Sequence, residues 1–178
     1  MPNHCYNELI LNGSQKNIDE MFLFIASDES DFDFNKIIPY PEHFRQRDDD
    51  AEAARSKEDM AAFVEKYGDS HDGYNSGGYN WCCDSWGTKW NAYEVDRRGC
   101  SLFFQTAWSP PAPVIIALAK MFPDVTFHLE FFERGMGFAG GFTCLGRCDY
   151  ADETGEQFEA GKVVREWYTN EYRGSKGG

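Results

Sequence analysis

Four tryptophans in one part of the chain constrain its folding more than any other feature. Residues 79–95 read YNWCCDSWGTKWNAYEV, and a fourth tryptophan follows soon after. Rings of this size either fill a hydrophobic core or form a recognition surface, and Trp is enriched at binding hot spots. We expect at least two of the four to be core residues. A lysine beside the others can stack on a ring. The predicted binding residues in this region are Trp81, Trp86, Lys89, Trp90, Asn91 and Trp108.

The length and composition indicate one folded domain, with room for an appendage. The chain has 178 residues, of which 42% are hydrophobic and 16% aromatic, enough for a sizeable core. No apolar run approaches the roughly 20 residues that span a bilayer. The first residues, MPNHCYNELIL, lack the basic region and apolar stretch of a signal peptide. We therefore expect a cytoplasmic protein that does not enter a membrane.

The charge is strongly acidic. Thirty acidic residues against 17 basic ones give a net charge of −13. A phosphate-binding surface needs clustered Lys and Arg, so nucleic acids and anionic membranes are disfavoured as partners. Docking onto a basic protein surface fits this charge, and so does a merely solvated acidic surface.

The cysteines and histidines give only weak metal-binding signals. Cys144 and Cys148 have a possible ligand spacing, but no second pair completes a zinc site. His71 lies between Asp69 and Asp72, where it can join a metal site or simply be solvated. We predict no metal site and no cofactor, with the cysteines reduced and several of them in the core.

No group of residues identifies a reaction. His128 and Glu130 share a strand face and Glu133 is nearby, which makes a conceivable acid–base set. Residues two apart share a face in any strand, so this spacing alone indicates little. His4 and Cys5, being adjacent, point to opposite faces. We predict no catalytic residues.

The first part of the chain reads as strand, helix and extended segment. Residues 7–13 predict a strand, and Ser14 predicts the start of a helix that ends near residue 27. Residues 32–38 predict a second extended segment that ends at Pro39. The apolar face of the helix is Ile18, Phe22 and Ile25.

Residues 42–80 predict a charged insertion. Asp48, Asp49 and Asp50 suit a helix N-terminus. A helical apolar repeat then ends at Gly68, and residues 69–80 predict a loop. The repeat consists of Met60, Phe63, Val64 and Tyr67.

A hairpin and a second helix follow. Residues 90–95 and 100–107 predict strands joined by a turn at residues 96–99. Ser109, as a cap before Pro110, predicts a helix that Pro123 terminates.

The last predicted strands flank a glycine-rich segment. Residues 125–132 predict a strand, with Val125, Phe127, Leu129 and Phe131 on one face and Thr126, His128, Glu130 and Phe132 on the other. Residues 134–141, RGMGFAGG, lack the ending of a phosphate-binding loop and predict a link to a strand at residues 142–150. Gly135 and Gly137 can let a partner approach the backbone, so we include them among the binding residues. A turn at residues 152–155 can begin a further hairpin arm.

This order predicts an α+β fold with a ferredoxin-like βαββαβ core, an antiparallel sheet with helices on one face. The predicted domain is residues 1–150, with the charged helix-plus-loop insertion at residues 42–80. We expect residues 151–178 to form a partly flexible C-terminal hairpin extension. RNA readers use similar sheets with exposed aromatics, and Phe103 and Phe104 suit such a strand, but their neighbours are not basic.

Several motifs resemble the YubB-type ferredoxin-like proteins. The motifs are MPN-x-C-x-N, FDFNKIIPYPE, NWCCDSWGTKWNAY, TAWSPPAPVIIAL and GMGFAGG, and they span roughly residues 1–145. Members of this family are small proteins carried by phages, plasmids and related bacterial elements. The resemblance implies the fold and a mobile-element setting in a bacterial host, and it transfers no catalytic residues.

We therefore expect an acidic, non-enzymatic binding protein of a phage, plasmid or other mobile element. Its expected partner is a host protein with a basic surface, such as a defence or nucleic-acid-handling protein that it inhibits. The acidic part of the insertion, residues 48–72, would contact that surface, and the tryptophans would add shape-specific contacts. The alternatives are a small metal-dependent or nucleotide-processing enzyme that uses Cys144, Cys148, His71 or the glycine-rich segment, and a domain whose conspicuous residues serve folding. The sequence leaves the oligomeric state open.

Overall fold

The structure is a computed structural model that describes residues 3–68, 78–146 and 161–170. The predictions that concern His71, Cys148, the turn at residues 152–155 and the flexible tail lie outside these ranges. In chain order the elements are β1 (His4–Asn12), α1 (Gln15–Ile25), a 3-10 helix (Phe34–Lys36), α2 (Glu42–Ala53), α3 (Lys57–Tyr67), α4 (Tyr79–Ser85), β2 (Tyr93–Arg98), β3 (Ser101–Ala107), α5 (Ala112–Met121), β4 (Thr126–Glu133), β5 (Phe138–Cys144) and β6 (Val163–Thr169).

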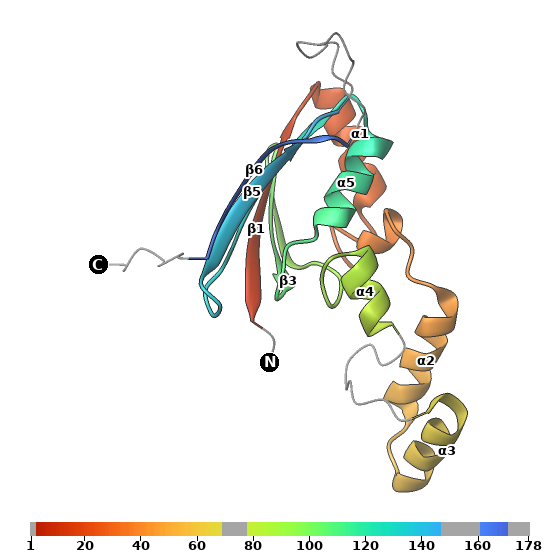
Figure 1. Cartoon of the computed structure of the whole chain (residues 1–178). Coiled ribbons are helices and arrows are strands. Elements are labelled where there is room, and N and C mark those ends of the chain that lie inside the picture. The colour runs from red at the N-terminus through yellow and green to blue at the C-terminus, as the bar shows by residue number, and fades with distance from the viewer. Residues whose placement is uncertain (1–2, 69–77, 147–160, 171–178) are drawn as a thin grey trace.

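The fold is α+β with a ferredoxin-like core, as predicted. The described strands form one antiparallel sheet in the order β2-β3-β1-β4-β5-β6. Within it, β1, α1, β2, β3, α5 and β4 make the βαββαβ unit, with β1 between β3 and β4. Helices α1, α4 and α5 lie on the same side of the sheet (Figure 1). Strand β5 pairs with β4, and β6, which lies in the predicted C-terminal extension, pairs with β5 at the edge of the sheet.

The hydrophobic core lies between the sheet and helices α1 and α5. The two predicted faces of residues 125–132 are confirmed, because Phe127 and Leu129 are buried whereas Glu130 is exposed on the other face. None of the described helices is long and apolar enough to cross a bilayer. The largest contributions to the core come from Leu9, Ile18, Met21, Ile25, Phe32, Phe34, Leu102, Ile115, Leu118, Phe127 and Leu129.

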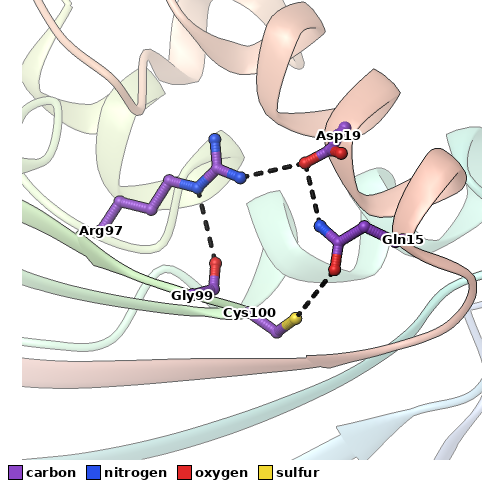
Figure 2. Close-up of polar contacts among 5 residues, drawn as sticks. All are labelled: Gln15, Asp19, Arg97, Gly99 and Cys100. Atoms are coloured by element: carbon purple, nitrogen blue, oxygen red, sulfur yellow. Dashed lines mark hydrogen bonds and ion pairs between the residues drawn. The ribbon is translucent and has the colours of Figure 1, made fainter.

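Arg97 joins helix α1 to the β2–β3 hairpin (Figure 2). Its Nη2 donates to Asp19 Oδ1 at 3.1 Å, and its Nε donates to the Gly99 carbonyl at 3.5 Å. Gln15 donates to the same Asp19 oxygen at 3.0 Å. The guanidinium carbon also lies 3.7 Å from the centre of the Phe22 ring. The helix is therefore fixed on the sheet by stacking as well as by an ion pair.

Of the helix starts predicted at Ser14 and Ser109, the first is correct and the second is wrong. The Ser14 side chain accepts a hydrogen bond from the Asn17 backbone N–H at 3.2 Å, as a helix cap does. Ser109 does not cap α5, because its hydroxyl donates to the Gly87 carbonyl at 2.6 Å. Helix α5 begins later, after Pro111, which offers no side-chain cap.

The predicted extended segment at residues 32–38 is wrong, because a 3-10 helix forms there. Asp33 Oδ1 accepts from the Asn35 N–H at 2.9 Å and caps its start. Asn91 Oδ1 accepts from the Phe34 N–H at 2.9 Å, and Asn91 Nδ2 donates to Asp33 Oδ1 at 2.7 Å. These bonds to a residue far along the chain stabilise the turn.

The same contacts delay the start of β2. The strand was predicted at residues 90–95 but runs from Tyr93 to Arg98, because Asn91 is held against the 3-10 helix. Residues 96–98, predicted as part of a turn, continue the strand. The turn lies at Gly99, where a φ of +61° suits glycine.

The charged insertion contains two helices, α2 and α3, which extend away from the sheet (Figure 1). The predicted helix end at Gly68 is confirmed. The aspartates at residues 48–50 lie in the last part of α2 and not at a helix N-terminus, which corrects that prediction. Asp50 joins the two helices, since its Oδ2 accepts from Lys66 Nζ at 2.7 Å and from the Tyr67 hydroxyl at 2.6 Å. Tyr79, predicted in a loop, begins α4.

The glycine-rich segment also differs from its prediction as a link. Residues 138–144 form strand β5, and the turn before it is short, with Gly137 at a φ of +75°. The strand ends at Cys144, well before the predicted residue 150. A strand of small residues is possible here because bulky neighbours cover it. A Cβ on Gly140 would lie 2.5 Å from the Phe131 ring.

Because two thiols are buried, we expect the folded protein to lose stability in alkaline solution. Burial raises the pKa of Cys5 to about 12 and that of Cys144 to about 11. Above pH ~9 the unfolded chain releases these protons and the folded chain retains them, so stability falls as pH rises, by up to about 1.4 kcal/mol per pH unit for each thiol. Urea unfolding at pH ~9 and ~10 measures this slope. A Cys5→Ala/Cys144→Ala variant should show a shallower slope, and an equal slope would contradict the prediction.

Candidate binding site on the helix-free sheet face

The tryptophan cluster is divided between the core and the surface. Trp86 is 4% exposed, and its Nε1 donates to the Ile38 carbonyl at 2.8 Å. Trp81 is partly buried, with its ring centre 5.3 Å from that of Trp86. Both residues therefore contribute to packing around α4.

The predicted stacking of Lys89 on aromatic rings is confirmed. Its Nζ lies 5.3 Å from the Tyr79 ring, 5.4 Å from the Trp90 ring and 5.2 Å from the Trp108 ring. All three rings belong to the same chain. Trp90 and Trp108 are half-buried, and their contacts with Lys89 consolidate the loops between α4, β2 and α5.

The other predicted binding residues have structural contacts. Asn91 uses its amide on the 3-10 helix, as described above. Gly135 lies in the β4–β5 turn, where its N–H donates to the carboxylate of Glu133 at 2.6 Å. A Cβ there would lie 2.5 Å from the Asn3 side chain. Gly137 completes the turn with a positive φ. The two glycines thus serve a tight turn, and their proposed approach to a partner stays a prediction.

A groove lies on the face of the sheet opposite the helices, and we call it the open-face groove. Its volume is about 470 Å³. Alternate residues of β1, β3 and β4 point into it, with residues of β2, β5 and β6 at its sides. Among the described residues that line it, none is Lys or Arg. Its aromatic and acidic lining residues include Tyr6, Glu8, Glu94, Phe103, Glu130, Phe132 and Trp167.

Aromatic rings form much of this groove. Tyr6 and Phe132 lie opposite each other in the β1–β4 register, and their rings stack at 4.9 Å with an angle of 11°. Trp167 packs across Gly141, since a Cβ on that glycine would lie 2.7 Å from the indole Nε1. Trp167 remains 47% exposed, so part of its ring can contact a ligand. Phe103 completes the set on β3.

Carboxylates lie among these rings. Glu8 and Glu130 are direct cross-strand partners in the β1–β4 register. Like charges in this position destabilise a sheet. His128 Nε2 lies 3.3 Å from Glu130 Oε1, whereas Glu8 forms no ion pair within the described part of the chain. Such a pair is favourable when a cation lies between the two groups.

Glu94 adds a third carboxylate at the edge of the groove. It has a φ of +52°, which is rare for a residue with a side chain, and it lies in a β-bulge between Tyr93 and Asp96. Bulges redirect side chains, and strained backbone concentrates at functional sites. The strain here places one more acid beside the aromatic rings.

The geometry does not assemble the acid–base set considered from the sequence. His128 and Glu130 lie on the open face, but Glu133 is 1% exposed on the opposite face and accepts hydrogen bonds from the β4–β5 turn. Cys144 is fully buried. Within residues 3–68, 78–146 and 161–170, no three His, Cys, Asp or Glu side chains are grouped as metal ligands. The open-face groove is suited to binding a cationic, partly apolar ligand.

Most of this groove was not predicted from the sequence. The alternation in β4 correctly placed Glu130 and Phe132 on one face, and Phe103 was noted as a possible exposed aromatic. One sequence signal could have revealed the groove. A strand buried on both faces is apolar on both, whereas these strands carry aromatic and acidic residues together on one face. Tyr6 and Glu8, which alternate with buried residues of β1, carry the same signal.

Comparison with known proteins supports the fold of this region. Residues 85–169 match a family model described as a ferredoxin-like domain in Api92-like protein. The matched stretch covers just under half of the chain and runs from the end of α4 through β6. It supports a ferredoxin-like domain family, while the YubB-type resemblance and the mobile-element setting stay predictions. No curated protein and no solved structure matches the chain.

Proposed function

We propose that this protein is a binding protein that holds a basic segment of a partner protein in its open-face groove. The observation that carries the proposal is the opposed pair Glu8 and Glu130 in a groove lined by aromatic rings. Opposed carboxylates cost stability in the free sheet, and a partner's cation between them offsets that cost. Aromatic rings add apolar contacts, which make the binding of a charged partner specific.

The charge of the whole chain supports the same class of partner. A net charge of −13 attracts basic surfaces over a distance and accelerates encounter. The projecting helices α2 and α3 carry many acids and provide a second acidic surface beside the sheet domain. This surface is the one that the sequence predicted for partner contact.

The setting we propose follows from the motif resemblance. The protein acts in the cytoplasm of a bacterium that carries a phage, plasmid or related element. Its partner is a host protein with a basic surface, and defence or nucleic-acid-handling proteins have such surfaces because they bind phosphate backbones. Occupying that surface would inhibit the host protein without any catalytic step.

The test is affinity capture from a host lysate with the tagged full-length chain. The wild type should retain a basic protein at ~50 mM NaCl and lose most of it at ~300 mM, because salt screens charge pairs. Glu8→Gln/Glu130→Gln should weaken the affinity for that protein, once purified, by at least about tenfold. Isothermal titration calorimetry measures both affinities.

A matched control separates the groove from general charge. Glu20→Gln/Asp124→Asn removes the same charge from exposed positions on α1 and just after α5, away from the residues that line the groove. It should bind like the wild type. If the two double variants lose affinity equally, the groove is not the binding site. If no basic protein is retained above a charge-matched control protein, the proposed function is wrong.

A further inference from the structure

Two of the chain's own arginines already contact the aromatic rings of the open sheet face. The Arg98 guanidinium carbon lies 4.7 Å from the centre of the Phe103 ring. Its Nε and Nη2 each lie 2.7 Å from Asp96 Oδ2. A guanidinium is thus stacked on a ring of this face while a neighbouring carboxylate binds its edge.

The second arginine lies at the β4–β5 turn. The Arg134 guanidinium carbon is 5.7 Å from the centre of the Tyr6 ring and 5.6 Å from that of Phe132. It therefore approaches the same stacked ring pair that lines the groove. Both contacts come from the chain itself, and in both the cation over these rings is a guanidinium.

The interior of the groove repeats these components. The Tyr6–Phe132 ring pair stands directly beside the Glu8–Glu130 pair, two residues away on each strand. Aromatic faces and carboxylates are therefore adjacent, as they are around Arg98. The described lining contains no basic side chain of its own.

A guanidinium fits this arrangement better than an ammonium does. The guanidinium is planar and weakly hydrated, so it stacks on aromatic faces while its edge N–H groups reach carboxylates. An ammonium is compact and strongly hydrated, and it loses more hydration when it enters an aromatic groove. Trp167, half-exposed at the side, offers a further flat surface.

We infer that the open-face groove selects arginine side chains of its basic partner over lysine side chains. The inference rests on the proposed function and names its ligand. The partner segment presents at least one arginine to the ring pair, with Glu8 and Glu130 binding the guanidinium edge. Glu94, on the bulge, is placed to contact a second basic residue of the same segment.

The experiment compares two peptides on the intact protein. Both are short fluorescein-labelled Gly/Ser peptides, one with arginine at alternate positions and the other with lysine at the same positions. Fluorescence polarisation at ~50 mM NaCl gives each affinity. The arginine peptide should bind about tenfold more tightly, given the additional stacking that a guanidinium gains.

Variants show whether the rings cause the preference. Phe132→Leu should reduce the ratio of the two affinities toward unity. Trp167→Leu changes a ring that is 47% exposed, so it tests the same point at little cost to stability. Glu8→Gln/Glu130→Gln should weaken both peptides, and Glu20→Gln/Asp124→Asn should weaken neither.

The outcomes separate the inference from the proposed function. Equal affinities that both fall in Glu8→Gln/Glu130→Gln overturn the arginine preference and leave the binding of basic segments in place. A preference that neither Phe132→Leu nor Trp167→Leu reduces also overturns the role of the rings. If neither peptide binds, or both bind the Glu8→Gln/Glu130→Gln variant as well as the wild type, the inference and the proposed function both fail.

Discussion

Replacing Trp86 by alanine is expected to lower the free energy of unfolding by about 3–5 kcal/mol, the usual cost of removing a buried ring of this size. The Trp86 ring centre lies 5.7 Å from those of Phe34 and Tyr40 and 5.3 Å from that of Trp81. Its Nε1 donates to the Ile38 carbonyl. The substitution leaves a cavity beneath α4 and removes a hydrogen bond to the backbone.

Urea unfolding measures this loss, and two controls locate its origin. Trp86→Phe keeps a ring but not the donor, so it should cost about 1–2 kcal/mol. Trp167→Ala removes a ring that is 47% exposed and should cost less than about 1 kcal/mol. A loss below about 1 kcal/mol in Trp86→Ala would mean that the cluster around α4 does not stabilise the fold.

The fold was predictable where its signals are local. The helix after Ser14 begins with a capping side chain, and the strand at residues 126–133 alternates apolar and polar residues. Both signals depend only on residues that are a few positions apart, so they can be recognised in the sequence. The ferredoxin-like order follows because these elements alternate along the chain in the βαββαβ pattern.

The element boundaries that were predicted wrongly depend on contacts between residues far apart in the sequence. The 3-10 helix at Phe34–Lys36 depends on Asn91, and the same contact moves the start of β2 to Tyr93. Ser109 precedes Pro110 as a helix cap would, but its hydroxyl donates to the Gly87 carbonyl instead. Each of these interactions joins residues that only the finished fold brings together, so no local pattern reveals them.

The candidate site was harder to predict than the fold for a related reason. Tyr6 and Phe132 stack because β1 pairs with β4 in one register, and that register is a property of the sheet. The alternation in β4 separates its two faces but does not say which face lacks a helix. The four tryptophans that are close in sequence were predicted as binding residues, yet Trp86 is a core residue.

Replacing Glu133 by alanine is expected to cost about 3 kcal/mol, the second large effect on stability. Glu133 is 1% exposed. Its Oε1 accepts from the Gly135 N–H at 2.6 Å and its Oε2 from the Met136 N–H, so one carboxylate fixes the β4–β5 turn. Hydrogen bonds to a charged group contribute about 1.5–3 kcal/mol each, and alanine removes both. Urea unfolding measures the loss.

Glu130, on the same strand, provides the control because its carboxylate is exposed on the open face, whereas that of Glu133 is buried. Glu133→Gln keeps one acceptor oxygen, so it should cost about half as much as Glu133→Ala. Glu130→Gln should be neutral or slightly stabilising, because it relieves the repulsion from Glu8. Equal losses in Glu133→Gln and Glu130→Gln would contradict this division of roles. The expected contrast implies that this strand uses one glutamate to build the sheet and keeps another, at a cost to stability, for a ligand.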